Sequence, residues 1–169
     1  MSEKAVKLNN KFFISISLIL ICFFLDRFSK IYIINFFTKN DFSEYYVNSY
    51  LNYILVWNKG IAFGLFESDN QFYLLVTFII FCIILFIIYI LIKSKIFTEI
   101  VCFSIIAGGA IGNLFDRLYY KSVPDFIDLH YKDFHWFTFN VSDIFITIAI
   151  IILITFDLIK LKKEKITDE

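Results

Sequence analysis

Apolar residues gather in four long runs along the chain, at residues 12–37, 71–92, 96–115 and 141–160. A helix needs about 20 mainly apolar residues to cross the hydrocarbon core of a bilayer. The second run, QFYLLVTFIIFCIILFIIYILI, has no charged residue and matches this length most clearly. The pattern predicts four transmembrane helices within a single membrane domain, residues 1–169, with two longer connections at 38–70 and 116–140.

One stretch outside the runs has a different pattern. The segment YLNYILVW, residues 50–57, is rich in aromatic and β-branched side chains. Such a composition is typical of a strand, so we expect a short strand in the first long connection.

Composition and charge agree with a membrane protein. The chain is 59% hydrophobic, its mean hydropathy is +0.73, and its formal net charge is zero. A soluble domain of this size does not need that much apolar surface, and no basic field suggests a nucleic-acid partner. Lysines concentrate in the N-terminal tail, at 93–95 and in the C-terminal tail. The positive-inside rule then predicts cytoplasmic termini and two external connections.

Polar residues recur at one depth, near the outer ends of the runs. Asp26 lies 14 residues after Phe12, which places it roughly 21 Å from the inner surface. Ionisable groups inside a membrane are costly and indicate a functional site. The residues expected at this level are Asp26, Lys30, Asn113, Asp116, Arg117, Asn140 and Asp143.

Each of these polar groups also has a simpler interpretation. Asp26 and Lys30 are four residues apart, so we expect an ion pair that makes the first helix tolerable in lipid. Asp116 and Arg117, with Asn113, would form a network holding the third helix. The alternative for Asp116 and Arg117 is a pair of ordinary interfacial charges.

Four short motifs resemble the ordered blocks of the lipoprotein signal peptidases, also called type II signal peptidases. They are NKGIAF (58–63), GGAIGNLFDR (108–117), VPDFID (123–128) and FNVSD (139–143), and the spacing of Asp26 and Lys30 also fits. Ser142 departs from the family, which usually has alanine there. Arg27 is also less typical, and its role is left open.

The resemblance implies a fold and an activity. The fold would be an all-α integral membrane protein with four transmembrane helices and a small β-rich extracytoplasmic subdomain. The activity would be that of an aspartic endopeptidase in the bacterial cytoplasmic (inner) membrane, with its active site near the outer leaflet. Its substrates would be prolipoproteins, cut just before a cysteine that carries diacylglycerol.

The resemblance also implies residue roles. The catalytic pair would be Asp125 and Asp143, sharing one proton because two crowded carboxylates cannot both ionise easily. We expect Asp125 in a loop and Asp128 to be merely solvated. The substrate-binding and supporting residues would be Asn58, Gly60, Asn113, Asp116, Arg117 and Asn140.

We expect no metal and no cofactor. His130 and His135 are five residues apart, which suits no helical ligand pair, and we expect both in a loop. The three cysteines lie in apolar runs without CxxC spacing and are expected to be small buried hydrophobes.

The alternative function is a small cation or proton transporter or channel subunit, using Asp26, Asp116 and Asp143 as a relay. No inverted repeat supports it, and the second run carries no ionisable group to continue a path. A membrane scaffold would leave the clustering of Gly, Pro and Asp unexplained.

Overall fold

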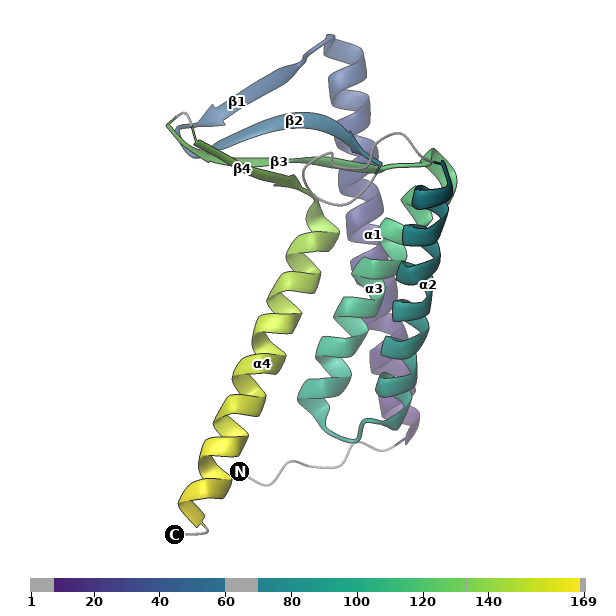
Figure 1. The fold of residues 1–169 in the computed structure, drawn as a ribbon, viewed down its shortest axis with the longest axis vertical. Coiled ribbons are helices and arrows are strands. Elements are labelled where there is room, and N and C mark those ends of the chain that lie inside the picture. The colour runs from purple at the N-terminus through teal and green to yellow at the C-terminus, as the bar shows by residue number, and fades with distance from the viewer. Residues whose placement is uncertain (1–7, 60–69, 133, 168–169) are drawn as a thin grey trace.

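Four helices form the body of the protein (Figure 1). The computed structural model describes residues 8–59, 70–132 and 134–167. Each helix contains a segment long and apolar enough to cross a membrane, of 31, 21, 24 and 23 residues in chain order. This confirms the four predicted transmembrane helices. Their bounds are α1 Leu8–Asn40, α2 Asn70–Lys93, α3 Phe97–Tyr120 and α4 Val141–Thr167.

The third helix is longer than its apolar run suggested. It continues to Tyr120, so Asp116 and Arg117 lie within α3 and not in the following connection. The helix therefore ends five residues beyond residue 115. Polar residues end an apolar run but not the helix, because their side chains are buried against neighbouring helices.

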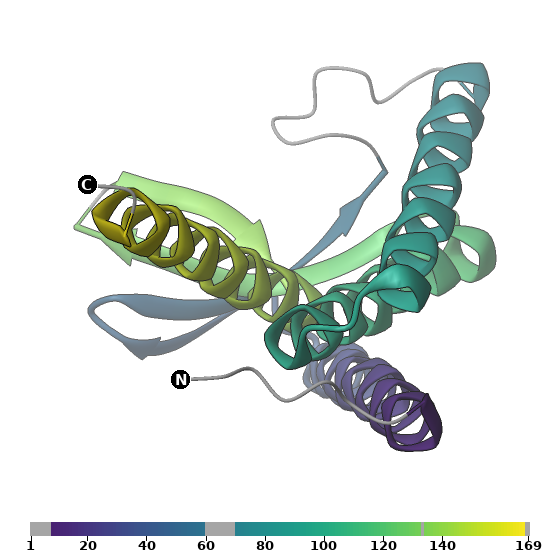
Figure 2. The ribbon, with the colours of Figure 1, turned by 90° about the horizontal axis from the view of Figure 1, so that it is seen from below.

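The central element of the bundle is α3, which packs against α1, α2 and α4. Glycine allows the contact with α1, since a Cβ at Gly108 would lie 2.7 Å from the Ile19 carbonyl oxygen. Small residues let membrane helices approach closely in this way. From its N-terminal end, α4 diverges from the other three helices (Figures 1 and 2).

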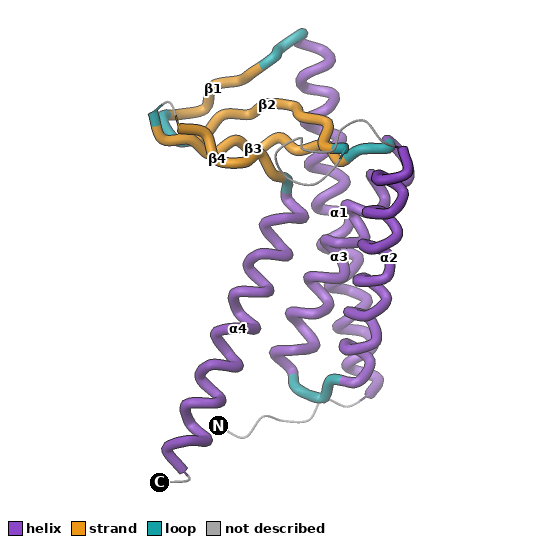
Figure 3. The backbone as a smooth tube through the Cα atoms, viewed as in Figure 1, coloured by secondary structure: helices purple, strands orange, loops and turns teal. Residues whose placement is uncertain are grey.

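A four-stranded antiparallel sheet lies across one end of the bundle (Figure 3). The predicted strand at residues 50–57 is confirmed, and the sheet confirms the expected β-rich subdomain. Its strands, in spatial order, are β1 Glu44–Asn48, β2 Leu51–Asn58, β3 Val123–Tyr131 and β4 Phe134–Phe139.

The sheet is anchored on the first helix by an apolar cluster. Phe126 of β3 packs against Ile33 and Phe37 of α1, and all three are buried. On the helices, by contrast, many large apolar side chains face outward, such as Phe78 and Phe86 of α2 at 63% and 61% exposure. This arrangement suits a bundle whose solvent is lipid.

Candidate active site

Asp125 and Asp143 come from different elements and line one cavity. Asp125 is the third residue of β3, and Asp143 is in the first turn of α4. The cavity has a volume of about 350 Å³ and is also lined by Asn58, Asn113 and other polar residues. The loop expected around Asp125 is therefore a strand, and that prediction was wrong. It forms because β3 pairs with β2, with Val56 opposite Asp125.

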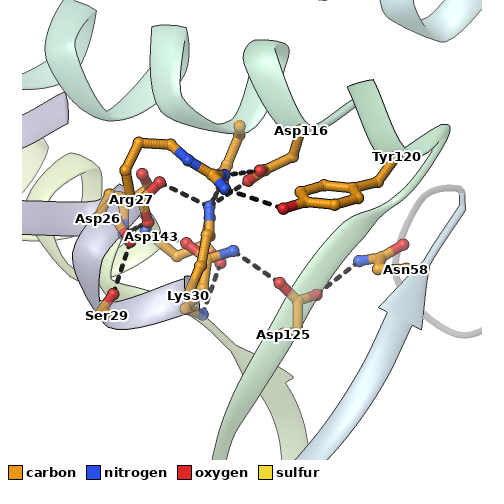
Figure 4. Close-up of polar contacts among 12 residues, drawn as sticks. Asp26, Arg27, Ser29, Lys30, Asn58, Asp116, Tyr120, Asp125 and Asp143 are labelled. Atoms are coloured by element: carbon orange, nitrogen blue, oxygen red, sulfur yellow. Dashed lines mark hydrogen bonds and ion pairs between the residues drawn. The ribbon is translucent and has the colours of Figure 1, made fainter. Parts of the chain in front are cut away.

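Two amides hold the Asp125 carboxyl group, and Figure 4 shows the first of them. The Asn58 side chain donates to Oδ2 at 2.9 Å, and Asn140 donates to Oδ1 at 2.6 Å. Only 3% of Asp125 is exposed. Burial raises the pKa of Asp125 to about 6; the two amide hydrogen bonds oppose this rise, and the charge of Asp143 adds to it. Asp125 therefore keeps a proton at a pH where an exposed carboxyl would be ionised.

Asp143 is fixed by the start of its own helix. The Asn140 backbone N–H donates to Asp143 Oδ2 at 3.0 Å, and the Asp143 N–H donates to Asn140 Oδ1 at 3.2 Å. This reciprocal pair is a capping box. Asn113 of α3 donates to the other oxygen, Oδ1, at 2.9 Å. Asn140 thus binds both aspartates at once.

Lys30 lies beside the pair as the centre of a buried charge cluster (Figure 4). Its ammonium group donates to Asp26 at 2.7 Å, Asn113 at 2.8 Å and Asp116 at 2.6 Å. Lys30, Asp26 and Asp116 are all 0% exposed. The predicted contact of Asp26 with Lys30 is present, but Lys30 also joins α1 to α3.

Arg27 completes this cluster. Its guanidinium group forms an ion pair with Asp116 and lies 4.9 Å from the ring centre of Phe115. It also donates to the Tyr120 hydroxyl at 3.4 Å. Arg27, whose role the sequence left open, is therefore a second cation that pairs with Asp116, beside Lys30. The signal was visible in the sequence as an arginine inside an apolar run, but its partner was not.

The other oxygen of Asp26 connects α1 to α4. The Ser142 backbone N–H donates to Asp26 Oδ1 at 3.1 Å. Gly112 of α3 faces the same point, since a Cβ there would lie 2.6 Å from Asp26 Oδ2 and 2.9 Å from Ser142 Oγ. Three helices therefore meet around the Asp26 carboxylate.

Arg117 is a buried residue of the cavity wall. It is 6% exposed, and its backbone oxygen accepts a hydrogen bond from the Tyr73 hydroxyl of α2. Asp116 is also fully buried, so the interpretation of this pair as ordinary interfacial charges was wrong. The sequence gives no signal for this role of Tyr73, because nothing in its apolar surroundings marks a polar contact.

Gly60 and Asp128 are two further residues for which the sequence made a prediction. Gly60 lies outside the described residues. Asp128 is not solvated: it is 1% exposed, does not line the cavity, and its Oδ2 lies 2.8 Å from His135 Nδ1. The two histidines are strand residues of β3 and β4, so their assignment to a loop was also wrong.

Below its polar end, the cavity has apolar walls. The side chains come from the three helices α2, α3 and α4, and most are isoleucines. A carboxylate pair therefore sits at the end of an apolar space between membrane helices. The wall residues are Ile80, Ile83, Ile84, Ile87, Ile106, Ala110, Ile146 and Ile150.

Comparison with known proteins gives a consistent result. The family model of signal peptidase (SPase) II matches residues 18–159. A protein named lipoprotein signal peptidase from Pelagibacter ubique (strain HTCC1062) is 46% identical over 154 residues, covering 90% of this chain and 92% of the relative. One of the same name from Anaplasma phagocytophilum (strain HZ) is 40% identical over 139 residues, covering 80% and 86%.

Two solved structures of bacterial membrane enzymes share the fold. One has a TM-score of 0.67 at 23% identity and covers 100% of this chain and 97% of its own. The other has a TM-score of 0.66 at 26% identity, with 92% and 96% coverage. With its four apolar helices and bacterial relatives, the protein is a multi-pass bacterial membrane protein. The chain belongs to the signal peptidase II family.

Proposed function

We propose that this protein is a membrane aspartic endopeptidase that removes the signal peptide from diacylglyceryl-modified prolipoproteins, with Asp125 and Asp143 as the catalytic pair. The observation that carries the proposal is their shared partner. Asn140 donates from its side chain to Asp125 and from its backbone to Asp143. One residue thus fixes two carboxyl groups at one cavity, as acid–base hydrolysis by a pair requires.

The pair divides proton transfer between its two members. The ionised carboxylate takes a proton from water as the water oxygen attacks the scissile carbonyl carbon. The protonated carboxyl donates its proton to the carbonyl oxygen. As the tetrahedral intermediate collapses, the carboxyl that took the proton from water gives it to the leaving amine nitrogen and the C–N bond breaks. One hydroxyl of the intermediate returns a proton to the other carboxylate, which restores the pair. The raised pKa of Asp125, about 6, supports a shared proton near neutral pH.

The neighbouring polar residues position this chemistry. Asn58, Asn113 and Arg117 line the same cavity as the pair. Asn58 and Asn113 each hold one carboxylate oxygen of the pair. They keep the two acids oriented, while the Lys30 cluster holds α1 and α3 beneath them. We assign Arg117 to the cavity wall, where it contacts substrate. Gly60 keeps its proposed place in the substrate-binding segment.

The apolar part of the cavity suits a lipidated substrate. A signal peptide is an apolar helix, and a diacylglyceryl group adds two acyl chains. The isoleucine walls contributed by α2, α3 and α4 provide an apolar surface that continues from the carboxylates. Such a substrate reaches the pair without leaving the membrane.

The protein is oriented with its sheet outside the cytoplasm. The N-terminal end of α1, the turn between α2 and α3 and the C-terminal end of α4 lie at the end opposite the sheet (Figure 1). Lysines gather at these parts, at Lys11, Lys93, Lys95 and four positions between 160 and 165, which supports cytoplasmic termini in the inner membrane. The single membrane domain then holds its active site near the outer leaflet. The transporter alternative draws no support from the comparisons.

Replacing either aspartate by asparagine tests the proposal. Asparagine cannot ionise or donate an acidic proton, so Asp125→Asn and Asp143→Asn should each abolish cleavage of a diacylglyceryl-modified precursor in detergent or liposomes. The double variant should be about as inactive as either single variant, because the pair acts as a unit.

Asp157→Asn is the matched control. Asp157 is on the same helix as Asp143 but is exposed, so this variant should cleave at the parent rate. Thermal unfolding recorded in parallel should show that all the variants are folded. Substantial turnover by Asp125→Asn or Asp143→Asn would remove the pair from the mechanism.

A further inference from the structure

A second cluster of polar side chains lies on the β3–β4 hairpin, away from the cavity. It consists of Asp128, His130 and His135, and so includes both histidines of the chain. Strand register brings it together: His130 of β3 is paired with His135 of β4, and Asp128 precedes His130 by two residues on the same strand face. In Figure 1 the hairpin extends away from the ends of α2 and α3.

The three side chains converge on one point. One ligand atom from each lies within 4.8 Å of the other two. Asp128 Oδ2 is 2.8 Å from His135 Nδ1 and 3.7 Å from His130 Nδ1. Ligand atoms on tetrahedral zinc are roughly 3.3 Å apart, given bonds of about 2.0–2.1 Å. The two separations bracket that value, and the third, between the two histidines, is at most 4.8 Å.

Burial separates the three residues into two buried groups and one half-exposed group. The side chains of Asp128 and His130 are 2% and 9% exposed, whereas that of His135 is 50% exposed. His135 can therefore adjust, and its open side leaves room for water ligands. A catalytic or transiently occupied metal site commonly has such an open position.

His130 provides a second, independent observation at this cluster. Its Nδ1 is buried and has no hydrogen-bond partner among the residues that the structure describes. A buried polar atom without a partner costs free energy and calls for an explanation. This atom faces Asp128 Oδ2 at 3.7 Å, too far for a hydrogen bond but suitable for two ligands of one cation.

We propose that Asp128, His130 and His135 bind a divalent transition-metal ion of the zinc class. Two imidazoles and one carboxylate are a ligand set for zinc, whereas calcium and magnesium prefer oxygen ligands alone. A spacing of five residues excludes a pair of histidine ligands only on a helix. Across a hairpin the same spacing places the two rings face to face, with centres 5.1 Å apart.

The ion would connect β3, which carries Asp125, to β4, which precedes the helix that carries Asp143. β3 holds Asp125 three residues before Asp128, and β4 leads directly into Asn140 and α4. Asp125 and Asp128 lie on opposite faces of β3, because strand side chains alternate. The ion therefore restrains the hairpin from outside the cavity and takes no part in peptide hydrolysis. The metal site does not depend on the proposed peptidase activity, and the two can be tested separately.

Metal titration of the full-length protein tests the site. The protein is purified without a histidine tag, stripped with a chelator, and titrated in detergent with Co²⁺ and then Zn²⁺. We expect visible absorption bands from Co²⁺ bound at one ion per chain, their loss when Zn²⁺ displaces Co²⁺, and a higher melting temperature with Zn²⁺.

Variants locate the ion. His130→Ala, His135→Gln and Asp128→Asn should each weaken Zn²⁺ binding at least about tenfold. Asp41→Asn is the control, since Asp41 is an exposed acid in the connection between α1 and β1, and it should bind as the parent does. His135→Gln changes a half-exposed side chain, so it tests the site even if a buried variant fails to fold. The proposal is overturned if Co²⁺ produces no bands, or if His135→Gln binds Zn²⁺ as tightly as the parent.

Discussion

At the scale of single residues, the four charges of the Lys30 cluster cancel. Arg27 and Lys30 are the cations, and Asp26 and Asp116 are the anions. The Asp26–Lys30 contact could be predicted, because residues four apart share a helix face. The partner of Arg27 could not, because Asp116 lies 89 residues away and only the packing of α1 on α3 brings them together.

This balance predicts a compensating pair of substitutions. Asp116→Asn leaves an excess positive charge in the cluster and should cost about 3–5 kcal/mol of stability. Adding Arg27→Gln restores neutrality, so the double variant should unfold at a higher temperature than Asp116→Asn alone. Thermal unfolding in detergent provides the measurement. If the two losses simply add, the cluster is not balanced in this way.

The raised pKa of Asp125 predicts a pH dependence of stability. Its folded pKa of about 6 exceeds the ordinary value of 3.8, so the folded state favours the protonated acid. This contribution is complete below pH 3.8 and is lost as the pH rises through 6, a change of at most about 3 kcal/mol. The melting temperature of the parent should therefore fall between pH 4 and about 7.

The melting temperature of Asp125→Asn should fall less over the same pH range, because this variant has no carboxyl group at position 125. Asp157→Asn, which changes an exposed acid, should follow the parent curve. Parallel curves for the parent and Asp125→Asn would show that Asp125 titrates normally.

At the scale of elements, the sequence predicted helices better than strands. An uninterrupted run of about 20 apolar residues is a local signal, so each helix could be located from its own residues. β3 could not, because VPDFID contains a proline and two acids. It becomes a strand by pairing with β2. Asn58 of β2 lies opposite Val123 of β3, although α2 and α3 stand between these two residues in the sequence. The position of the two histidines depends in turn on the pairing of β3 with β4.

Glycine at position 112 predicts an unusual response to alanine. In most helices alanine is more favourable than glycine by about 1 kcal/mol. Here a Cβ would lie 2.6 Å from Asp26 Oδ2 and 2.9 Å from Ser142 Oγ. Gly112→Ala should therefore destabilise the protein by about 1–3 kcal/mol, measured by thermal unfolding.

A second substitution in α3 controls for the general effect of changing this helix. Leu118 is 60% exposed, so Leu118→Ala should leave the melting temperature nearly unchanged. A stability gain in Gly112→Ala would mean that the three helices do not meet as closely as described.

At the scale of the whole molecule, the separation of the sheet from the lysine-rich end predicts a membrane orientation. A reporter that is active only outside the cytoplasm should be silent when fused after Glu169. The same reporter inserted in the turn between β1 and β2, at residues 49–50, should be active. Activity of the C-terminal fusion would reverse the proposed topology and place the carboxylate pair at the inner surface.

The divergence of α4 has a kinetic consequence. Together with α2, it borders an apolar cavity that ends at the two aspartates, and away from the sheet it separates from the rest of the bundle. A substrate that reaches this cavity from within the membrane searches in two dimensions. Encounter frequency then depends on the number of substrates per unit area of membrane, so diluting the bilayer with inert lipid slows turnover even when the amount of substrate per volume is constant.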